Sequence, residues 1–237
     1  IVDAVEADIA ARAGAVRSTQ EVGEAIASRV AGQVAVHCPL LDQLTERTNV
    51  SDMETPAFSP LVELNQQAKS SAVRDEILAN PGFGNHFTDH MFLAEWTPEA
   101  NWHDPRVVPY GPLMLDPATA VLHYAQEIFE GLKAYAHADG SVWSFRPEQN
   151  AARLQRSARR LALPELPIDW FMGSIRALIA ADRAWVPTGE ERSLYLRPFM
   201  FASEVFLGVR PSHHVTYSVI ASPAGAYFAG GVKPVDI

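Results

Sequence analysis

Two arginines and a tyrosine are the residues of this sequence best suited to binding a small anion. Arg153 stands near the start of an expected helix, and an arginine fork can grip phosphate oxygens through two parallel hydrogen bonds. Tyr195 and Arg197 are two residues apart in an expected strand, so both side chains project from the same face, as does Phe199. A cation bordered by aromatic rings can accept a carboxylate and a hydrocarbon chain in one pocket. The pattern therefore predicts a site for a small molecule that carries both.

Each of these side chains also has a plainer explanation. Three further arginines share the expected helix of Arg153, namely Arg156, Arg159 and Arg160. Spacing alone favours a solvated basic face for this helix. An edge-strand ion pair with a packed tyrosine would account for Tyr195 and Arg197, and Pro198 favours an edge or a bulge there. Residue types and spacing leave these alternatives open.

Metal chemistry and acid-base chemistry find less support. His86 and His90 are four residues apart, which suits a metal on a helix, but Phe87 stands where a zinc protease motif needs Glu. Asp89 beside His90 is a coincidence of only two residues. The sequence contains no Walker loop and no dinucleotide-binding glycine fingerprint. We therefore predict no metal site.

The composition is that of an ordinary soluble protein with one or two cores. The 237 residues are 48% hydrophobic and 20% charged, and the net charge of -9 gives no support to a nucleic-acid or anionic-membrane partner. Cys38 is the single cysteine, which rules out an internal disulfide and suits a reducing compartment. No run of eighteen apolar residues occurs. We expect a cytoplasmic protein that acts on small molecules.

Strands and one hairpin follow from period-two patterns and turn signals. The runs that predict strands are residues 58–64, 90–96, 106–108, 193–201 and 214–221. Two alternating runs, 133–138 and 141–145, flank Asp139 and Gly140, a dipeptide suited to a type I′ turn. This pattern predicts a hairpin.

Three helices complete the expected domain. A polar, solvent-exposed helix should end before Pro81, and a second should cover residues 147–161 with Pro147 in its first turn. The third should cover residues 168–185, with one apolar face made by Phe171, Met172, Ile175, Leu178 and Ile179. Together with the strands they predict an α+β domain.

Four segments resemble the branched-chain amino acid aminotransferases in order and spacing. They are LHYAQEIFEGLKAY at residues 122–135, NAARL at 150–154, SLYLRP at 193–198 and SPAGAYF at 222–228. The likeness runs from about Phe58 to the last residue. This family contains fold type IV pyridoxal-phosphate enzymes, in which the cofactor lies between a smaller N-terminal domain and a larger second domain. The resemblance implies the small domain here, with the second domain truncated.

The resemblance also implies a role for individual residues. Arg153 matches the arginine that holds the cofactor phosphate, and Tyr195 and Arg197 match substrate-contacting positions. The full set of positions implied to contact substrate is Phe83, Tyr124, Phe129, Tyr195, Arg197, Leu207, Val209 and Tyr227. In the family the tyrosine matched by Tyr124 reaches across a homodimer interface, and the loop matched by Leu207 and Val209 enters the partner's site. Ordinary core packing is the alternative for each aromatic ring.

The implied activity is transfer of the amino group of leucine, isoleucine or valine to 2-oxoglutarate, and the reverse. The lysine that forms the Schiff base in the family lies in a later segment, so we expect no catalytic residue in this sequence and no activity from it as given. Lys133 and Lys233 do not match the catalytic position. D-amino acid transaminase, aminodeoxychorismate lyase and a non-catalytic fragment are the alternatives. The FEGLK and YLRP segments argue against the first two.

The chain is expected to divide into three parts. Residues 1–52 carry helical patterning that then fades, and we interpret them as an extension outside the aminotransferase. The run STQEVGEAI at residues 18–26 resembles the C-terminal tail of 3-isopropylmalate dehydrogenases, a likeness that covers residues 1–32. Residues 53–228 would form the aminotransferase domain, with Met53 as a natural start, and residues 229–237 a truncated interdomain connection.

Overall fold

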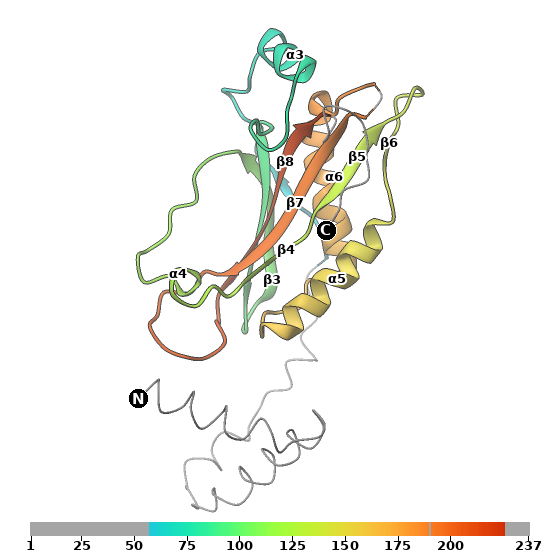
Figure 1. Cartoon of the computed structure of the whole chain (residues 1–237). Helices are drawn as coiled ribbons and strands as arrows, with labels where there is room; N and C mark the ends of the chain where they lie inside the picture. The colour runs from blue at the N-terminus through green and yellow to red at the C-terminus, as the bar shows by residue number, and fades with distance from the viewer. Residues whose placement is uncertain (1–56, 190, 226–237) are drawn as a thin grey trace, which may run out of the picture. The chain divides into compact units, whose positions relative to one another are not determined.

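A single mixed sheet organises the part of the chain that the computed structural model describes, residues 57–189 and 191–225 (Figure 1). Its eight strands are β1 (Leu61–Val62), β2 (His90–Thr97), β3 (Asn101–Pro109), β4 (Glu127–Phe129), β5 (Leu132–Ala136), β6 (Val142–Ser144), β7 (Ser193–Ala202) and β8 (Val215–Ala224). The order is β1-β3-β2-β8-β7-β5-β6, and β4 also pairs with β7. Only β1 and β3 pair in parallel. The expectations for residues 1–52, 229–237 and Tyr227 lie outside the described residues.

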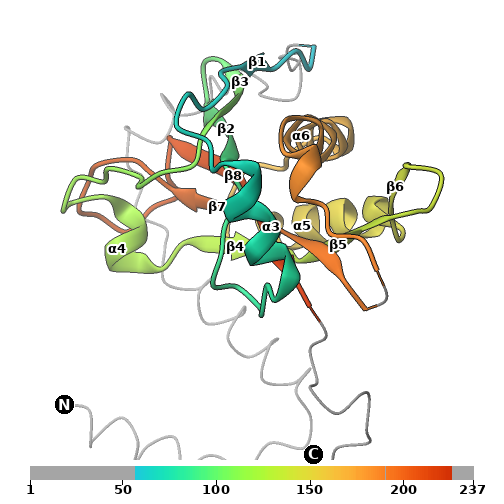
Figure 2. The same ribbon diagram turned by 90° about the horizontal axis from the view of Figure 1, so that it is seen from above.

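Helices cover one face of this sheet and leave most of the other face open. The helices are α3 (Ser71–Ala79), α4 (Ala120–Tyr124), α5 (Pro147–Arg160) and α6 (Ile168–Ala181), followed by the 3-10 helix η3 (Arg183–Trp185). Both views place α5 and α6 on the same side, where α6 contacts β2, β3 and β8 and α5 contacts β4 (Figure 2). The α+β expectation is confirmed. In the described part of the chain, no helix combines the length and apolar character that a membrane crossing requires.

The central strands match the sequence-based predictions, with one extension. β2, β7 and β8 fall where the runs at 90–96, 193–201 and 214–221 predicted them. β3 begins earlier than expected, at Asn101, because the chain accommodates Pro105 in a bulge: the register shifts between Leu93 and Glu95, and Asp104 adopts φ 52°. The prediction stopped at Arg106 because a proline usually interrupts a strand.

The strand predicted at residues 58–64 is largely wrong. Only Leu61–Val62 pair with β3, and Phe58 instead enters the core. Its ring centroid lies 5.9 Å from that of Phe92 and 5.5 Å from that of Trp170. An aromatic side chain recovers more free energy from such packing than from a two-strand ladder at the sheet edge.

The hairpin is confirmed, but its turn is not of type I′. β5 and β6 pair as predicted, with Ala134 opposite Ser144. A type I′ turn needs positive φ at both central residues, whereas only Gly140 has it, at 82°. The Gly140 N–H donates to the His137 carbonyl, and the Asp139 carboxylate accepts from the Ser141 N–H at 2.9 Å. The loop is therefore a type I turn closed by a glycine bulge.

The three helices form largely as predicted. α3 buries none of its side chains, and α5 carries Pro147 in its first turn. α6 buries Phe171, Ile175 and Leu178 but ends at Ala181 rather than at residue 185. Asp182 ends the helix because its carboxylate turns inward and accepts hydrogen bonds from His90.

Close packing between α6 and Phe58 gives a first testable prediction. A Cβ added at Gly173 would lie 2.5 Å from the Phe58 ring, which is packed against Phe92 and Trp170. Gly173→Ala should therefore destabilise the fold by about 1–3 kcal/mol, even though alanine favours helices. Urea unfolding would measure the change. Gly111→Ala is the matched control, because its Cβ would meet nothing within 4 Å. Equal midpoints for the two variants would contradict the prediction.

Candidate functional site

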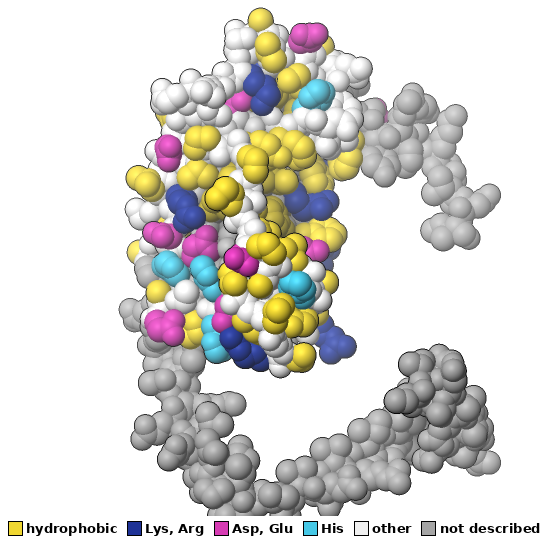
Figure 3. Space-filling model, turned by 90° about the vertical axis from the view of Figure 1, so that its left-hand side faces the viewer, with side chains coloured by type: hydrophobic (Ala, Val, Ile, Leu, Met, Phe, Trp, Pro, Cys, Tyr) yellow, Lys and Arg dark blue, Asp and Glu magenta, His cyan; other side chains and the backbone are white. Residues whose placement is uncertain are grey.

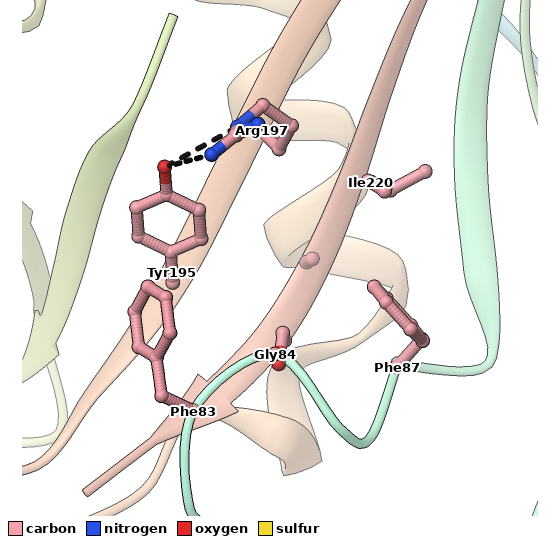
Figure 4. Close-up of a pocket in the computed structure, with 8 residues that line it drawn as sticks. Phe83, Gly84, Phe87, Tyr195, Arg197 and Ile220 are labelled. Atoms are coloured by element: carbon pink, nitrogen blue, oxygen red, sulfur yellow. Dashed lines mark hydrogen bonds between the residues drawn. The ribbon is translucent and has the colours of Figure 1, made fainter.

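Tyr195 and Arg197 lie together on the open face of β7. Alternate residues of β7, Leu194, Leu196 and Met200, are fully buried, so the two polar side chains project from the other face. Arg197 Nη2 donates a hydrogen bond to the Tyr195 hydroxyl at 2.8 Å, and Nε lies 3.2 Å from the same oxygen (Figure 4). The predicted pairing of phenol and guanidinium on one strand face is present.

A hollow of about 220 Å³ opens beside this pair. We call it the β7–β8 hollow, and its lining residues are Phe83, Gly84, Phe87, Tyr195, Arg197, Ile220, Ala221 and Ser222. The Phe83 ring stands 5.2 Å from the Tyr195 ring, centroid to centroid. One cation, one phenol and several apolar groups therefore border the same small volume, which suits a ligand with a carboxylate and a hydrocarbon chain.

Phe129 packs against the opposite side of the Arg197 guanidinium. The Arg197 Cζ atom lies 4.4 Å from the Phe129 ring centroid and 5.4 Å from the Tyr195 ring centroid. Phe129 lies on β4, opposite Phe199 of β7, which places it on the same sheet face as Arg197. The two rings hold the guanidinium by cation–π contacts and restrict its rotation.

Gly131 makes room for the Tyr195 hydroxyl. Gly131 stands between Phe129, opposite Phe199, and Leu132, opposite Leu196, so it faces Arg197 across the ladder. A Cβ at this position would lie 2.3 Å from the Tyr195 hydroxyl oxygen. Only glycine therefore allows the observed position of Tyr195 beside Arg197.

Arg153 lies on the α5 side and does not border the β7–β8 hollow. Its Nε and Nη2 atoms donate to the two carboxylate oxygens of Glu130 at 2.6 and 2.7 Å. Hydrogen bonding to Glu130, together with its charge, raises the pKa of the Arg153 guanidinium. Glu130 and Gly131 are consecutive, so this ion pair and the Tyr195–Arg197 pair attach to opposite faces of one strand segment. The sequence-based expectation of a phosphate contact at Arg153 stays a prediction.

The remaining expected substrate contacts lie around the open face rather than in the hollow. α4 ends at Tyr124, and Ala125 with φ 47° turns the chain before β4, so Tyr124 and Phe129 belong to different elements. Leu207 and Val209 are 70% and 98% exposed in the loop between β7 and β8. Hydrophobic side chains gather on this side of the molecule, away from α5 and α6 (Figure 3).

An ion pair supports the loop that carries Leu207 and Val209. Arg210 donates to both carboxylate oxygens of Glu204, at 2.7 and 2.9 Å. The hydrogen bond from Arg210 lowers the pKa of Glu204 to about 2. Because the folded-state pKa lies below the ordinary value, this contribution is present above about pH 4.5 and is lost as the pH falls towards 2.

Buried polar residues next to the hollow are fully engaged in hydrogen bonds. The His90 Nδ1 atom lies 2.7 Å from Asp182 Oδ1, and its Nε2 accepts from the Asn65 N–H at 2.8 Å. Asp89 accepts from the Trp185 indole at 2.7 Å. Burial alone would raise the pKa of Asp89, but hydrogen bonds from Trp185 and Lys69 hold it below its ordinary value. These groups hold segments together, and both ring nitrogens of His90 are occupied.

Residues 57–189 and 191–225 contain no group of three or more His, Cys, Asp or Glu side chains placed to hold a metal ion. His86 is exposed, whereas His90 is buried against Asp182. The two histidines therefore do not form a shared site in the described part of the chain.

Sequence reasoning missed several residues that shape the site. Ile220 and Ser222 border the hollow because they stand opposite Arg197 and Tyr195 in the β7–β8 ladder. Strand periodicity could have identified them once the register was known. Phe87, Glu130 and Asn150 gave no comparable signal, since their partners are distant in sequence.

The fold and this site define a class: an α+β domain that presents an arginine and a tyrosine on an open sheet face. No protein-family model matches the chain. Among curated proteins, the branched-chain-amino-acid aminotransferase of Mycolicibacterium smegmatis is 62% identical over 177 residues, covering 74% of this chain and 48% of the relative. The branched-chain-amino-acid aminotransferase 2 of Bacillus subtilis is 47% identical over 155 residues, covering 65% and 43%.

Solved structures give a weaker match. The branched-chain amino acid aminotransferase from Escherichia coli matches with a TM-score of 0.42 and 25% identity over 58% of this chain and 41% of its own. The T.th. enzyme, solved with pyridoxamine 5'-phosphate, matches with a TM-score of 0.45 and 25% identity over 59% and 42%.

Sequence identity of about 60% to curated relatives over three quarters of the chain shows that this chain belongs to the branched-chain amino acid aminotransferase family. The chain spans about half the length of the curated relatives it matches. The recognition made from the four sequence segments is confirmed.

Proposed function

We propose that the complete protein transfers the amino group of leucine, isoleucine or valine to 2-oxoglutarate, and the reverse, with pyridoxal phosphate as cofactor. The family relationship and the pairing of Arg197 with Tyr195 in the β7–β8 hollow support this proposal. The named relatives favour it over D-amino acid transaminase or aminodeoxychorismate lyase. The arginine–tyrosine pair beside apolar walls carries most weight.

The substrate side of the reaction would use the two faces of the Arg197 guanidinium region. Arg197 and the Tyr195 hydroxyl supply hydrogen-bond donors for a carboxylate. Phe83 and Ile220 supply apolar surface for a branched aliphatic chain within the same hollow. Phe129 would hold the guanidinium in place from the other side. One arrangement can thus orient both glutamate and an aliphatic amino acid.

Arg153 fits a cofactor phosphate. A guanidinium has five N–H donors, and the two bonds to Glu130 leave three of them on the other edge of the group. The side chain is 59% exposed, so this edge is accessible. When bound, pyridoxal phosphate supplies an electron sink for carbanionic charge on the substrate. Arg153 would hold its anionic end.

The lysine that bonds to the cofactor would come from outside the described residues. Such a lysine must have its pKa lowered, for example by desolvation, to act as a nucleophile. Lys69 is tied to Asp89 and to the Phe87 carbonyl, and Lys133 is exposed on β5. Neither borders the β7–β8 hollow. The inactivity of the chain as given stays a prediction, as does a cytoplasmic location.

A homodimer is part of the proposal. Several large apolar side chains are exposed around the open sheet face, among them Leu122, Leu207, Val209 and the almost fully exposed Met114. Monomeric proteins rarely expose apolar patches of this kind without a partner. Tyr124, at the end of α4 on this side, would extend towards the partner's site.

The cofactor assignment can be tested with two arginines of the same helix. Arg153→Ala should weaken pyridoxal phosphate binding by the complete protein about tenfold or more, because a charge-assisted fork is lost. Arg156→Ala should change it much less. Titration of the cofactor-free protein, followed by absorbance, gives both dissociation constants. Equal losses in the two variants would refute the role of Arg153.

The substrate assignment can be tested by comparing two amino donors. Glutamate carries a second carboxylate that leucine lacks, so Arg197→Ala should lower kcat/KM for glutamate about tenfold more than for leucine. Arg176, exposed on α6, provides the control variant Arg176→Ala. A uniform loss for both substrates would count against a carboxylate role for Arg197.

A further inference from the structure

Glu130 is a buried carboxylate whose oxygens are bonded from two residues of α5. Its side chain is only 3% exposed. Arg153 binds both oxygens, and the Asn150 side-chain amide donates to one of them at 2.9 Å. A buried carboxylate is stabilised only when such donors are supplied. The sequence places Asn150 and Arg153 three residues apart on one helix, so both reach the same carboxylate.

The backbone around Glu130 is fixed as firmly as its side chain. The Glu130 N–H donates to the Pro198 carbonyl at 2.8 Å, and the Asn150 amide also donates to the Gly131 carbonyl at 3.2 Å. The carboxylate is therefore anchored to the strand that carries Tyr195 and Arg197. It presents a fixed acceptor to α5.

This anchoring determines the orientation of the Arg153 guanidinium. An exposed arginine samples many rotamers, and ordering it on a ligand costs conformational entropy. The bidentate bond to Glu130 engages one edge of the planar group and turns the edge with three remaining donors outward. The guanidinium is thus ordered before any ligand arrives.

We propose that Glu130 is a positioning residue for the cofactor phosphate, acting through Arg153 with support from Asn150. This inference rests on the proposed function, in which Arg153 holds the phosphate of pyridoxal phosphate. Glu130 does not touch the cofactor, since a carboxylate would repel a phosphate. It fixes the plane and the free edge of the group that does.

A double-mutant cycle in the complete protein tests this role. Glu130→Gln should raise the dissociation constant for pyridoxal phosphate about tenfold, because the ionic fork that orders Arg153 is lost. Arg153→Lys, which keeps the charge but loses the fork, should raise it as well. The double variant should bind no worse than Arg153→Lys alone, since Glu130 acts through Arg153. Titration of cofactor-free protein provides all four constants.

Glu127→Gln is the matched control. Glu127 lies three residues away on β4 and is exposed, so its variant should bind the cofactor like the wild type. Glu130→Asp, which keeps the negative charge, should recover part of the affinity lost in Glu130→Gln. If Glu130→Gln does not fold, as judged by circular dichroism, Glu130→Asp replaces it in the cycle.

The outcomes separate this role from the proposed function. Additive losses in the double variant would show that Glu130 acts independently of Arg153 and would overturn the inference. Unchanged affinity in Glu130→Gln, with wild-type binding intact, would overturn it too while leaving the proposed function standing. A wild-type protein that fails to bind pyridoxal phosphate would overturn both.

Discussion

Gly131→Ala is expected to lower kcat/KM of the complete protein for branched-chain substrates about 100-fold, because displacing a positioning group by about 1 Å can cost that much. The added methyl group would lie 2.3 Å from the Tyr195 hydroxyl oxygen and 3.1 Å from the adjoining ring carbon. Tyr195 must move, and its hydrogen bonds with Arg197 break. The fold should persist, because the ring end is only partly buried and faces the open side.

A second substitution can show that the tyrosine transmits the effect. Tyr195→Phe removes the oxygen that the new methyl group would strike, so Gly131→Ala should cost less in that background than in the wild type. Thermal midpoints measured alongside would separate local displacement from unfolding. Gly111→Ala, with open space around its Cβ, should leave kcat/KM unchanged. An equal loss in both backgrounds would contradict the steric explanation.

Local periodicity explains the parts of the fold that the sequence predicted well. Tyr195 and Arg197 share a face because side chains alternate along any strand, whatever the strand pairs with. α5 and the body of α6 likewise follow from apolar spacing and from Pro147 in the first helical turn. These predictions needed no knowledge of tertiary contacts.

The errors share a different physical cause. Phe58 leaves its predicted strand for a pocket made by Phe92 and Trp170, and α6 stops where Asp182 turns towards His90. Asp139 avoids positive φ because its carboxylate binds Ser141. In each case a contact that periodicity cannot register decides the backbone conformation.

The site was predictable in its parts but not in its assembly. Family resemblance pointed to Arg153, Tyr195 and Arg197, but not to their distribution over two faces of one strand segment. That distribution depends on Glu130 and Gly131, which face opposite sides because they are consecutive in an extended chain. Glu130 binds α5 while Gly131 admits Tyr195. A dipeptide that reads as part of one motif thus serves both sides of the sheet.

The buried His90–Asp182 pair should dominate the stability of this domain. Asp182→Ala would leave the His90 ring N–H and backbone N–H without their acceptors, so we expect a loss of about 3–5 kcal/mol in the free energy of unfolding. Asp182→Asn retains an acceptor and should cost less.

Urea unfolding monitored by tryptophan fluorescence would measure both changes, since Trp185 lies next to the pair in sequence and is buried. Asp75→Ala, at an exposed position of α3, should change the free energy of unfolding by less than about 0.5 kcal/mol. Adding His90→Ala to Asp182→Ala should cost less than the sum of the single losses, because the two side chains satisfy each other. Additive losses would show that each side chain stabilises the fold through other contacts.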